Sequence, residues 1–283
     1  MFVMRSESFE VSGPVRASVK VEHGHVFVQH GAGVEQARVT LSPMIAGDEV
    51  AADLIARATV EFADGVLLVI VPPTPAGAGG STVVTSRGGM TVTQNFGHVS
   101  VGSNVVGMTI VNGRVVCGGG LNVSGAIVAG GVLGGGGVRV NVLVPEQSSV
   151  TARTVSADLD TGSFGEKSLD TVDFHTLSGG LHVGKALTVL ASTISGDVVV
   201  DAASQVQVTS TSGDVELEVG TRAEVSTVSG DVAVLAVHEG VRVSVATVSG
   251  DIRVTPIAPG MSIEVSTSTV NGKVRGPRAV QGR

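Results

Sequence analysis

Four aspartates in the second half of the chain have the residue type and the spacing that chemistry could use. Each stands between a Ser-Gly pair and an aliphatic residue, and they are Asp197, Asp214, Asp231 and Asp251. If they stack above one another, such a column could hold Ca²⁺, which prefers several oxygen ligands. Carboxylate clusters on stacked coils also serve polysaccharide lyases and hydrolases. The alternative is that each aspartate faces water and accepts hydrogen bonds from turn amides or nearby hydroxyls.

The repetition of these aspartates favours the structural interpretation. An enzyme needs one distinctive site, whereas this motif recurs, and the nearby cations Arg222, Arg242 and Arg253 are scattered. The calcium-binding nonapeptide repeat is absent, and the chain has no Trp or Tyr to form a sugar platform. We therefore predict that the protein is not an enzyme and has no cofactor and no metal site. The four aspartates remain a candidate surface column.

Three histidines near the N-terminus are a second candidate site. His23 and His25 could share one strand face, and His30 could join them across a turn, with Glu22 as a further zinc ligand. The alternative, which we favour, is exposed or singly hydrogen-bonded histidines. Cys117 is the only cysteine, so no internal disulfide is possible, and we expect it to be a small buried hydrophobic residue.

The element that positions the aspartates is a repeat. The phrase Ser-Gly-Asp-Val/Ile occurs four times, at 195–198, 212–215, 229–232 and 249–252, with degenerate copies at 178–181 and 271–274. A near-constant period with an apolar pattern is typical of stacked coils. A sandwich of hairpins would need a turn at every strand reversal, but here the turn recurs about once per coil. The sequence predicts an all-β fold: a single-stranded parallel β-helix (β-solenoid), right-handed, with coils of about 17–22 residues.

Each coil can be aligned on its glycine. Aliphatic residues stand two and four positions after it and seven before it, which predicts short strands on both sides of the turn. Threonine or serine stands three positions before the glycine, and serine or asparagine one position before. We expect both hydroxyl columns at outward or corner positions, where stacked side chains can bond to one another.

The pattern divides the chain into three domains. Residues 1–73 form a β-rich N-terminal module with one short helix near 48–57. Residues 74–137 are a Gly-rich segment of linker and irregular coils, in which 118–137 could instead be a flexible linker. Residues 138–283 form the regular solenoid and a basic C-terminal tail.

Composition excludes several function classes. A net charge of −7 argues against nucleic-acid binding, which needs a basic footprint. No stretch reaches 18 uninterrupted apolar residues, so no transmembrane segment is predicted. The first residues lack the cationic lead and apolar region of a secretory signal. We therefore expect a cytoplasmic protein, with surface exposure by a non-classical route left open.

The residues from 138 onward also carry a family resemblance. The strand Val-Arg-Val-Asn-Val-Leu-Val-Pro at 138–145, the Ser-Ser-Val at 148–150 and the serial Thr-Val-Ser-Gly-Asp-Val phrases resemble the "putative adhesin" β-strand-repeat family of bacteria, a domain of unknown function. The resemblance implies a β-solenoid without catalytic residues. Bactofilins resemble the chain in architecture only; they are cytoplasmic β-solenoids that polymerise end to end.

These observations predict a non-catalytic structural or scaffolding protein that self-associates as a homo-oligomer or filament. The physical motive is that a solenoid ends in unpaired strand edges unless they are capped. The alternative is an adhesin-like binding module whose outward Thr/Ser/Asp face meets a protein or glycan partner.

Overall fold

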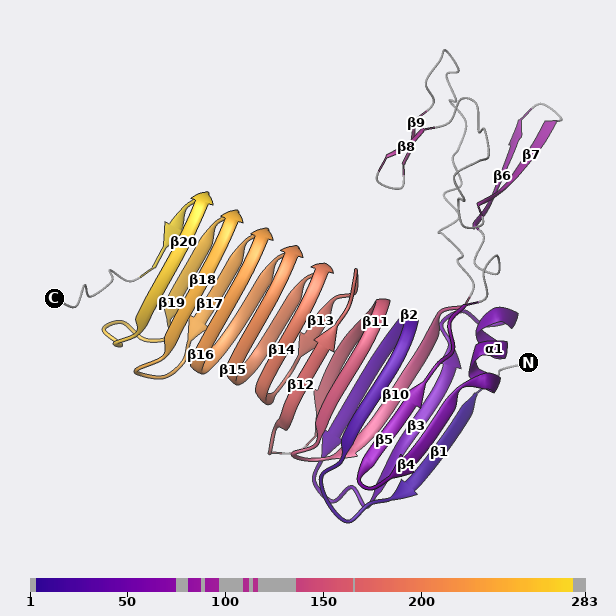
Figure 1. Ribbon diagram of the computed structural model, residues 1–283, viewed down its shortest axis with the longest axis horizontal. Helices are drawn as coiled ribbons and strands as arrows, with labels where there is room; N and C mark the ends of the chain where they lie inside the picture. Colours follow the sequence, from indigo (N-terminus) through magenta and orange to yellow (C-terminus); the bar gives the residue numbers. More distant parts are fainter. Residues whose placement is uncertain are drawn as a thin grey trace. The chain divides into compact units, whose positions relative to one another are not determined.

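A computed structural model describes residues 4–74, 136–164 and 166–276 with their side chains, and four short strands between residues 81 and 116 by their backbone. The chain forms two compact units, one made of Met1–Pro73 with Gly136–Arg283 and the other of Thr74–Gly135. Figure 1 traces both. Cys117 and most of the segment 118–137, about which two interpretations were left open, lie outside the described residues.

The second unit contains two antiparallel pairs within its described residues. They are β6 (Ser81–Arg87) with β7 (Met90–Phe96), and β8 (Thr109–Val111) with β9 (Arg114–Val116).

The first unit is built of stacked coils that pair in parallel (Figure 1). Its coil strands are β10 (Val138–Pro145), β11 (Ser149–Ser163), β12 (Leu169–His175), β13 (Leu181–Val183), β14 (Ala186–Ser195), β15 (Val198–Ser212), β16 (Val215–Ser229), β17 (Val232–Ala236), β18 (Arg242–Ser249), β19 (Ile252–Pro256), β20 (Glu264–Asn271) and β21 (Val274–Arg275). Residues one repeat apart are partners, as in Val198 with Val215 and Val215 with Val232. The predicted all-β, solenoid-like class is confirmed. Closure as a single-stranded β-helix and the right-handed sense stay predictions.

The coils have two faces that enclose the core. One face holds the residues after each glycine (β13, β17, β19, β21 and the first halves of β15 and β16), and the other holds the residues before it (β12, β14, β18, β20 and the second halves). Aliphatic side chains from both faces fill the space between them, for example Val206, Val215 and Val243, each at most 2% exposed. Valine suits a pleated, half-buried surface, and its burial stabilises the fold by roughly 1.5–3 kcal/mol per side chain.

The glycine of each repeat is required because neighbouring coils approach closely at the corner. A Cβ at Gly230 would lie 2.2 Å from the carbonyl oxygen of Gly213, and at Gly213 it would lie 2.4 Å from that of Gly196. Both residues also have positive φ angles, 137° and 126°. Glycine alone adopts this conformation readily and leaves room for the next coil.

The sequence predicts an outward or a corner position for the threonine column, and the structure places it at the corner. These hydroxyl residues are buried at the corner, with exposed fractions of 4–7%: Thr176, Thr193, Ser210, Thr227 and Thr247. Most of them bond to backbone groups there; the Thr227 hydroxyl donates to the Ser229 carbonyl at 3.3 Å. Turning inward lets the side chain satisfy carbonyls that the turn would otherwise leave without partners. The surface available for binding is therefore formed by other columns.

The N-terminal segment supplies one further coil and a cap. Its elements are β1 (Arg5–Glu10), β2 (Arg16–Gly31), β3 (Gln36–Pro43), α1 (Glu49–Arg57), β4 (Thr59–Ala63) and β5 (Val66–Ile70). Strand β2 pairs in parallel with both β10 and β11, so it lies within the stack (Figure 1). The antiparallel strands β1 and β3 continue one face, and β4 and β5 continue the other.

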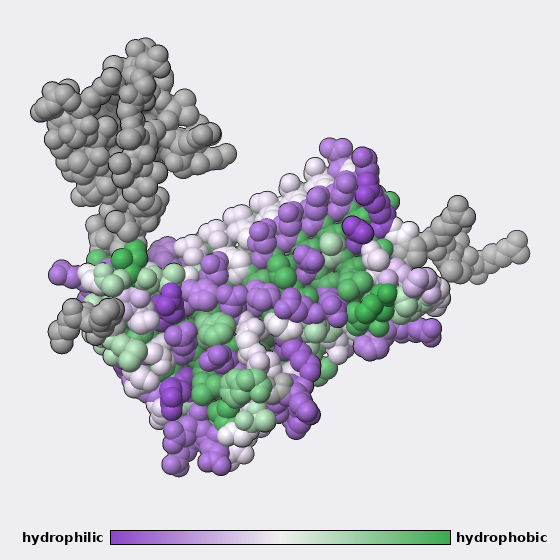
Figure 2. Space-filling model, turned by 180° about the vertical axis from the view of Figure 1, so that it is seen from behind, coloured by the Kyte–Doolittle hydropathy of each residue, from purple (hydrophilic) through white to green (hydrophobic). Residues whose placement is uncertain are grey.

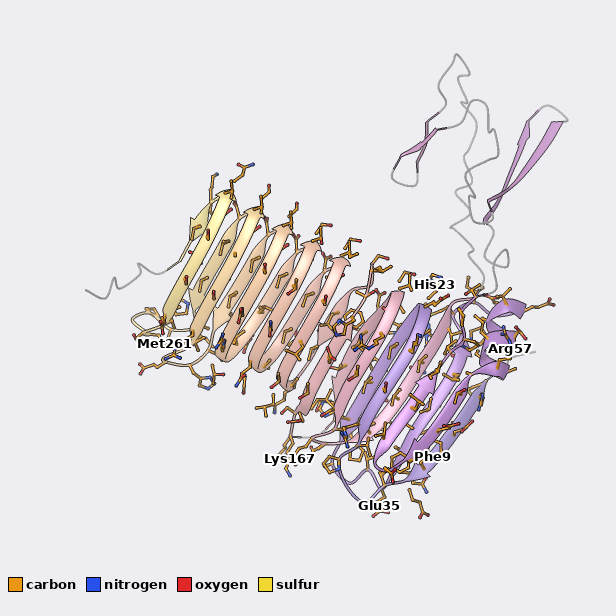
Figure 3. The ribbon with its side chains drawn as sticks, in the orientation of Figure 1. Phe9, His23, Glu35, Arg57, Lys167 and Met261 are labelled. Carbon is orange, nitrogen blue, oxygen red and sulfur yellow. The ribbon has the colours of Figure 1, made fainter. Side chains whose placement is uncertain are left out.

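The predicted helix is confirmed. The Asp48 side chain accepts a hydrogen bond from the Ala51 amide, an N-cap arrangement, and Ala51, Leu54 and Ile55 are buried. Figure 3 shows Arg57 at the end of α1 and Met261 in the loop before β20, at opposite ends of the stack. The three-domain division stays a prediction; in the structure, residues 1–73 share one hydrophobic core with the coils.

Candidate functional site

The four predicted aspartates lie in one column and form a ladder with the backbone. The Asp197 carboxylate accepts a hydrogen bond from the Asp214 amide at 2.9 Å, Asp214 accepts from the Asp231 amide at 2.9 Å, and Asp231 accepts from the Asp251 amide at 2.8 Å. Asp251 accepts from the Lys273 amide at 2.8 Å. Each exposed side chain thus ties its coil to the next, which is the structural role weighed from the sequence.

One oxygen of each aspartate accepts these hydrogen bonds. The carboxylates are exposed, so the column presents negative charge to solvent. At about 4.8 Å between coils, neighbouring charges repel by about 0.9 kcal/mol in water and about 3.5 kcal/mol at an effective dielectric constant of 20. Glu216 and Glu218 lie on the same side of the coils, and we call these residues the acidic face: Asp197, Asp214, Glu216, Glu218, Asp231 and Asp251.

Two shallow hollows lie along the acidic face. The first, of about 440 Å³, is lined by all four aspartates together with Val199, Glu216, Ala233, Arg253 and Arg275. The second, of about 500 Å³, is lined by Asp201, Glu216, Glu218, Leu235, Arg253 and Thr255 among others. The hollows arise because the small side chains of Val199 and Ala233 alternate with the long side chains of Glu216 and Arg253. The face thus offers carboxylates beside small apolar floors.

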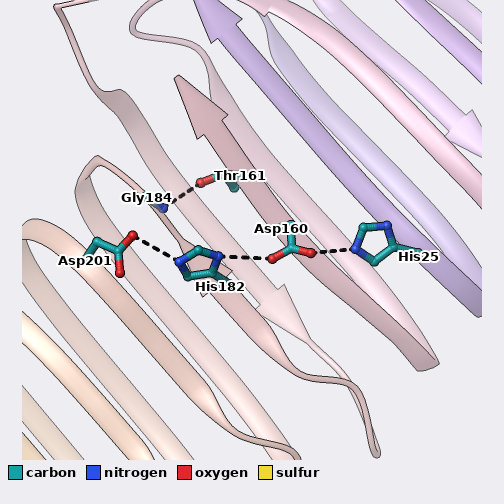
Figure 4. A network of polar contacts seen from close by, with 6 residues as sticks. All are labelled: His25, Asp160, Thr161, His182, Gly184 and Asp201. Carbon is teal, nitrogen blue, oxygen red and sulfur yellow. Dashed lines mark hydrogen bonds and ion pairs between the residues drawn. The ribbon is translucent and has the colours of Figure 1, made fainter. Parts of the chain in front are cut away.

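A second polar cluster crosses the successive paired strands β2, β11, β13 and β15. Figure 4 shows a chain of contacts from His25 through Asp160 and His182 to Asp201. The His25 Nε2 lies 2.6 Å from an Asp160 oxygen, the other Asp160 oxygen lies 3.2 Å from His182 Nδ1, and His182 Nε2 lies 3.0 Å from Asp201. We call these four residues the histidine–aspartate chain. It links successive coils through side chains alone.

The three predicted histidines do not converge on one point. His23 is exposed and bonds the Ser156 hydroxyl at 2.7 Å, His25 belongs to the histidine–aspartate chain, and His30 is buried. Figure 3 shows His23 at the margin of the coil stack. Within the described ranges, no group of three or more His, Cys, Asp or Glu side chains is arranged to hold a metal ion. The zinc alternative is thus unsupported.

His30 is unusual because it is fully buried and neither ring nitrogen has a hydrogen-bond partner in the described part of the chain. Desolvation by burial lowers its pKa from 6.5; Lys185 acts in the same direction and Glu146 opposes it. The ring is therefore held neutral at neutral pH, which argues against a role as a charged or exposed ligand.

Sequence reasoning missed Asp160, His182 and Asp201, as well as the coil that carries His25. A signal was present, because His23-Gly24-His25-Val26 has the form of the Ser-Gly-Asp-Val phrase. Gly24 has φ 135°, and its Cβ would lie 2.0 Å from the Val138 carbonyl oxygen, as at the repeat glycines. If His23 is aligned with the serine and His25 with the aspartate of the repeat phrase, β2 is predicted to be a coil of the stack.

An exposed apolar column runs beside the glycine corner. Its members stand two positions before each glycine, and about half or more of each is exposed: Leu177, Ile194, Val228, Val248 and Val270. Thr211 interrupts the column. Figure 2 shows apolar surface reaching the exterior between bands of polar side chains. The sequence shows that these residues are apolar, but it does not reveal that their side chains face solvent.

The fold and these surfaces define an all-β protein of stacked coils with two shallow hollows along one side. A model of the Toastrack DUF4097 family matches residues 85–281, well over half of the chain. The chain therefore belongs to the Toastrack DUF4097 family, and the resemblance drawn from its repeats is confirmed. A search of curated proteins finds no match.

Solved structures of bacterial proteins match this chain. A "putative adhesin" from Bacteroides fragilis matches with a TM-score of 0.51 and 12% identity over 96% of this chain and 97% of that one. A "putative adhesin" from Parabacteroides distasonis has a TM-score of 0.41 and 12% identity over 96% of both chains. A "putative lipid binding protein" from the same species has a TM-score of 0.36 and 9% identity over 97% of both. The first of these supports the fold.

No helix within the described residues is long and apolar enough to cross a membrane. The cytoplasmic location expected from the sequence stays a prediction, and so does the absence of nucleic-acid binding.

Proposed function

We propose that the chain is a non-catalytic, adhesin-like binding module whose acidic face engages a protein or glycan partner. The observation that carries this proposal is the combination of an exposed carboxylate column with two adjoining hollows on one side of the coils. A peptide or sugar lying in the hollows would meet carboxylate acceptors at every coil and small apolar floors between them. The Bacteroides fragilis structure that is similar to this chain is described as a "putative adhesin", which supports such a role.

The ladder geometry also favours binding over catalysis. Each aspartate has the same partner, a backbone amide of the next coil, so no one carboxylate is distinguished as an acid, base or nucleophile. A binding face can use equivalent positions, because several weak contacts add along a repeat.

The test separates charge from structure. In Asp214→Asn with Asp231→Asn, the amide oxygen can still accept the backbone hydrogen bond while both charges are removed. The probes are an array of immobilised glycans and a displayed library of basic and neutral peptides, each compared between wild type and variant. The control, Glu35→Gln with Glu61→Gln, removes two exposed charges elsewhere in the first unit.

We expect wild type and control to bind the same probes, and the aspartate variant to lose at least tenfold in affinity with a melting temperature that is not lowered. Equal binding by all three proteins would rule out the acidic face as the site. Hydrolysis or elimination products from any glycan would contradict the non-catalytic part of the proposal.

A self-associating scaffold is the second candidate, favoured by one observation at the end of the stack. Inward residues of the last coil are more exposed than their counterparts one coil earlier: Val274 is 47% exposed, whereas Ile252 is fully buried. A hydrophobic core that is open at one end is stabilised when another surface covers it. Mass measured by light scattering as a function of concentration tests this candidate, and a constant monomer mass would exclude it.

A further inference from the structure

The two ends of the stack differ in how their strand edges are protected. At the N-terminal end, Phe9 of β1 and Phe62 of β4 bring the two faces together, with ring centroids 5.8 Å apart. Arg5 in β1 pairs with Glu7 at 2.5 Å and donates to the carbonyls of Ile55 and Ala58 at the end of α1. Charged residues on an edge strand oppose pairing with another chain. Within the described residues β1 pairs only with β3 and β4 only with β5, so their outer edges are unpaired, and the charges protect them.

The other end lacks these features in the part of the chain that the structure describes. Strand β20 pairs with β18 on one side, and no described strand pairs with its other side. Its sequence, Glu-Val-Ser-Thr-Ser-Thr-Val-Asn, has one charged residue at its first position and no proline. The inward side chains Val265, Thr267 and Thr269 are partly exposed, and Val270 is 82% exposed.

We propose that β20 is the interface of a closed, two-fold symmetric dimer, in which β20 of one copy pairs antiparallel with β20 of a second copy. This proposal rests on the self-association candidate above and specifies its geometry. Head-to-tail growth would require β20 to meet β1 or β4 of the next copy, and the charged residues Arg5, Glu7 and Glu10 of β1 and Glu61 of β4 oppose that pairing. A two-fold interface uses the same surface twice and stops at two chains.

An antiparallel pairing keeps the like charges of the last coil apart. With Thr267 of one copy opposite Thr267 of the other, the core-facing residues Val265 and Thr269 lie opposite each other, and Glu264 lies opposite Val270. Glu264 pairs with Arg242 of its own chain at 3.0 Å. A parallel pairing would instead place the two Glu264 carboxylates opposite each other.

The size of the edge sets the expected affinity. An eight-residue strand is about 26 Å long, and the two faces of a coil lie about 10 Å apart. The area buried by such an end is below the roughly 1,200–2,000 Å² of stable interfaces. We therefore expect a weak dimer, with a dissociation constant of about 1–100 μM.

Sedimentation velocity of the 283-residue chain from about 1 μM to about 1 mM tests the proposal. The first variant is Thr267→Pro. The Glu264 amide donates to the carbonyl of Val241 in the preceding coil. Successive amides of a strand point to opposite edges. The amide of Thr267, three residues after Glu264, therefore points to the open edge. Proline there removes a donor that only the second copy would use.

A second variant tests the same interface without proline, in case Thr267→Pro does not fold. Ser266→Lys with Ser268→Lys changes two exposed side chains and places lysine opposite lysine twice across the seam. The matched control, Ser226→Lys with Ser244→Lys, adds the same charge at exposed positions in inner coils. Circular dichroism melting curves establish that each variant is folded.

The expected result is a mass that rises from one chain to two and stops, at least tenfold weaker association for both edge variants, and no change for the control. Mass that grows beyond two chains would leave self-association standing but overturn the closed dimer. A monomer at every concentration would overturn both. Dimers that persist in both edge variants, or that form only after residues 277–283 are deleted, would show that β20 does not bind a second copy in the intact chain.

Discussion

The regular coils and the N-terminal coils join their neighbours in different ways. From β15 to β21, one device repeats: a carboxylate accepts the amide of the next coil, and a glycine makes room for it. Around β2, β11 and β13, Asp158 still accepts the Gly180 amide at 2.8 Å, but individual side-chain contacts are added, as in the histidine–aspartate chain. In the repeated contact, one partner is a backbone amide, which every coil has. In an individual contact, both partners are particular side chains. Loss of a contact should therefore affect the two regions differently.

The largest expected effect is at the glycine corner of the regular coils. In Gly230→Ala, the new Cβ would lie 2.2 Å from the Gly213 carbonyl oxygen, and φ is 137°. Backbone of the neighbouring coil cannot move aside cheaply, so we expect the free energy of unfolding to fall by about 3 kcal/mol or more. Chemical denaturation measures this loss. Gly13→Ala is the control, because a Cβ there meets nothing within 4 Å; an equal loss in both would argue against the close approach.

The aspartate ladder should respond differently to two substitutions. Asp231→Ala and Asp231→Asn both remove the charge, but only Asp231→Ala removes the acceptor for the Asp251 amide, so it should be less stable than Asp231→Asn by about 1 kcal/mol. Asp231→Asn keeps an acceptor and removes repulsion of about 0.9 kcal/mol from each charged neighbour, so it should be neutral or stabilising, more so at low salt. Melting temperatures at low and high salt check both. If Asn were as harmful as Ala, the charge itself would be needed for the fold.

In the N-terminal coil, His30 should make stability depend on pH. Its pKa is lowered by burial, so between that value and the ordinary value of about 6.5 the unfolded chain binds more protons than the folded one. Stability from this residue is therefore lost as pH falls below about 6.5, by at most about 1.4 kcal/mol per pH unit. His30→Leu should flatten this part of the profile and leave the apolar packing filled. Urea denaturation between pH 7 and pH 5 measures the slope, and an unchanged slope would contradict the assignment.

The difference between the regions also explains what the sequence could predict. The period of the Ser-Gly-Asp-Val phrase reveals the coils, their strands and the aspartate column, because each repeat confirms the others. It does not reveal the inward turn of Thr227, since a hydroxyl suits either side of a corner and only the backbone decides. It also does not reveal Asp160 with His182, because their contact joins residues 22 positions apart in a region where the phrase is degenerate.

The histidine–aspartate chain should give the smallest effect. Asp160→Asn weakens its contacts to His25 and His182, but the carboxylate is 35% exposed and His182 48% exposed. Solvent screens such pairs, and exposed ion pairs are typically worth about 0.2–1 kcal/mol. A double-mutant cycle of Asp160→Asn with His182→Gln should therefore yield a coupling energy of about 0.5 kcal/mol. A coupling above about 2 kcal/mol would mean that the individual contacts hold the N-terminal coils as firmly as the glycine corner holds the regular ones.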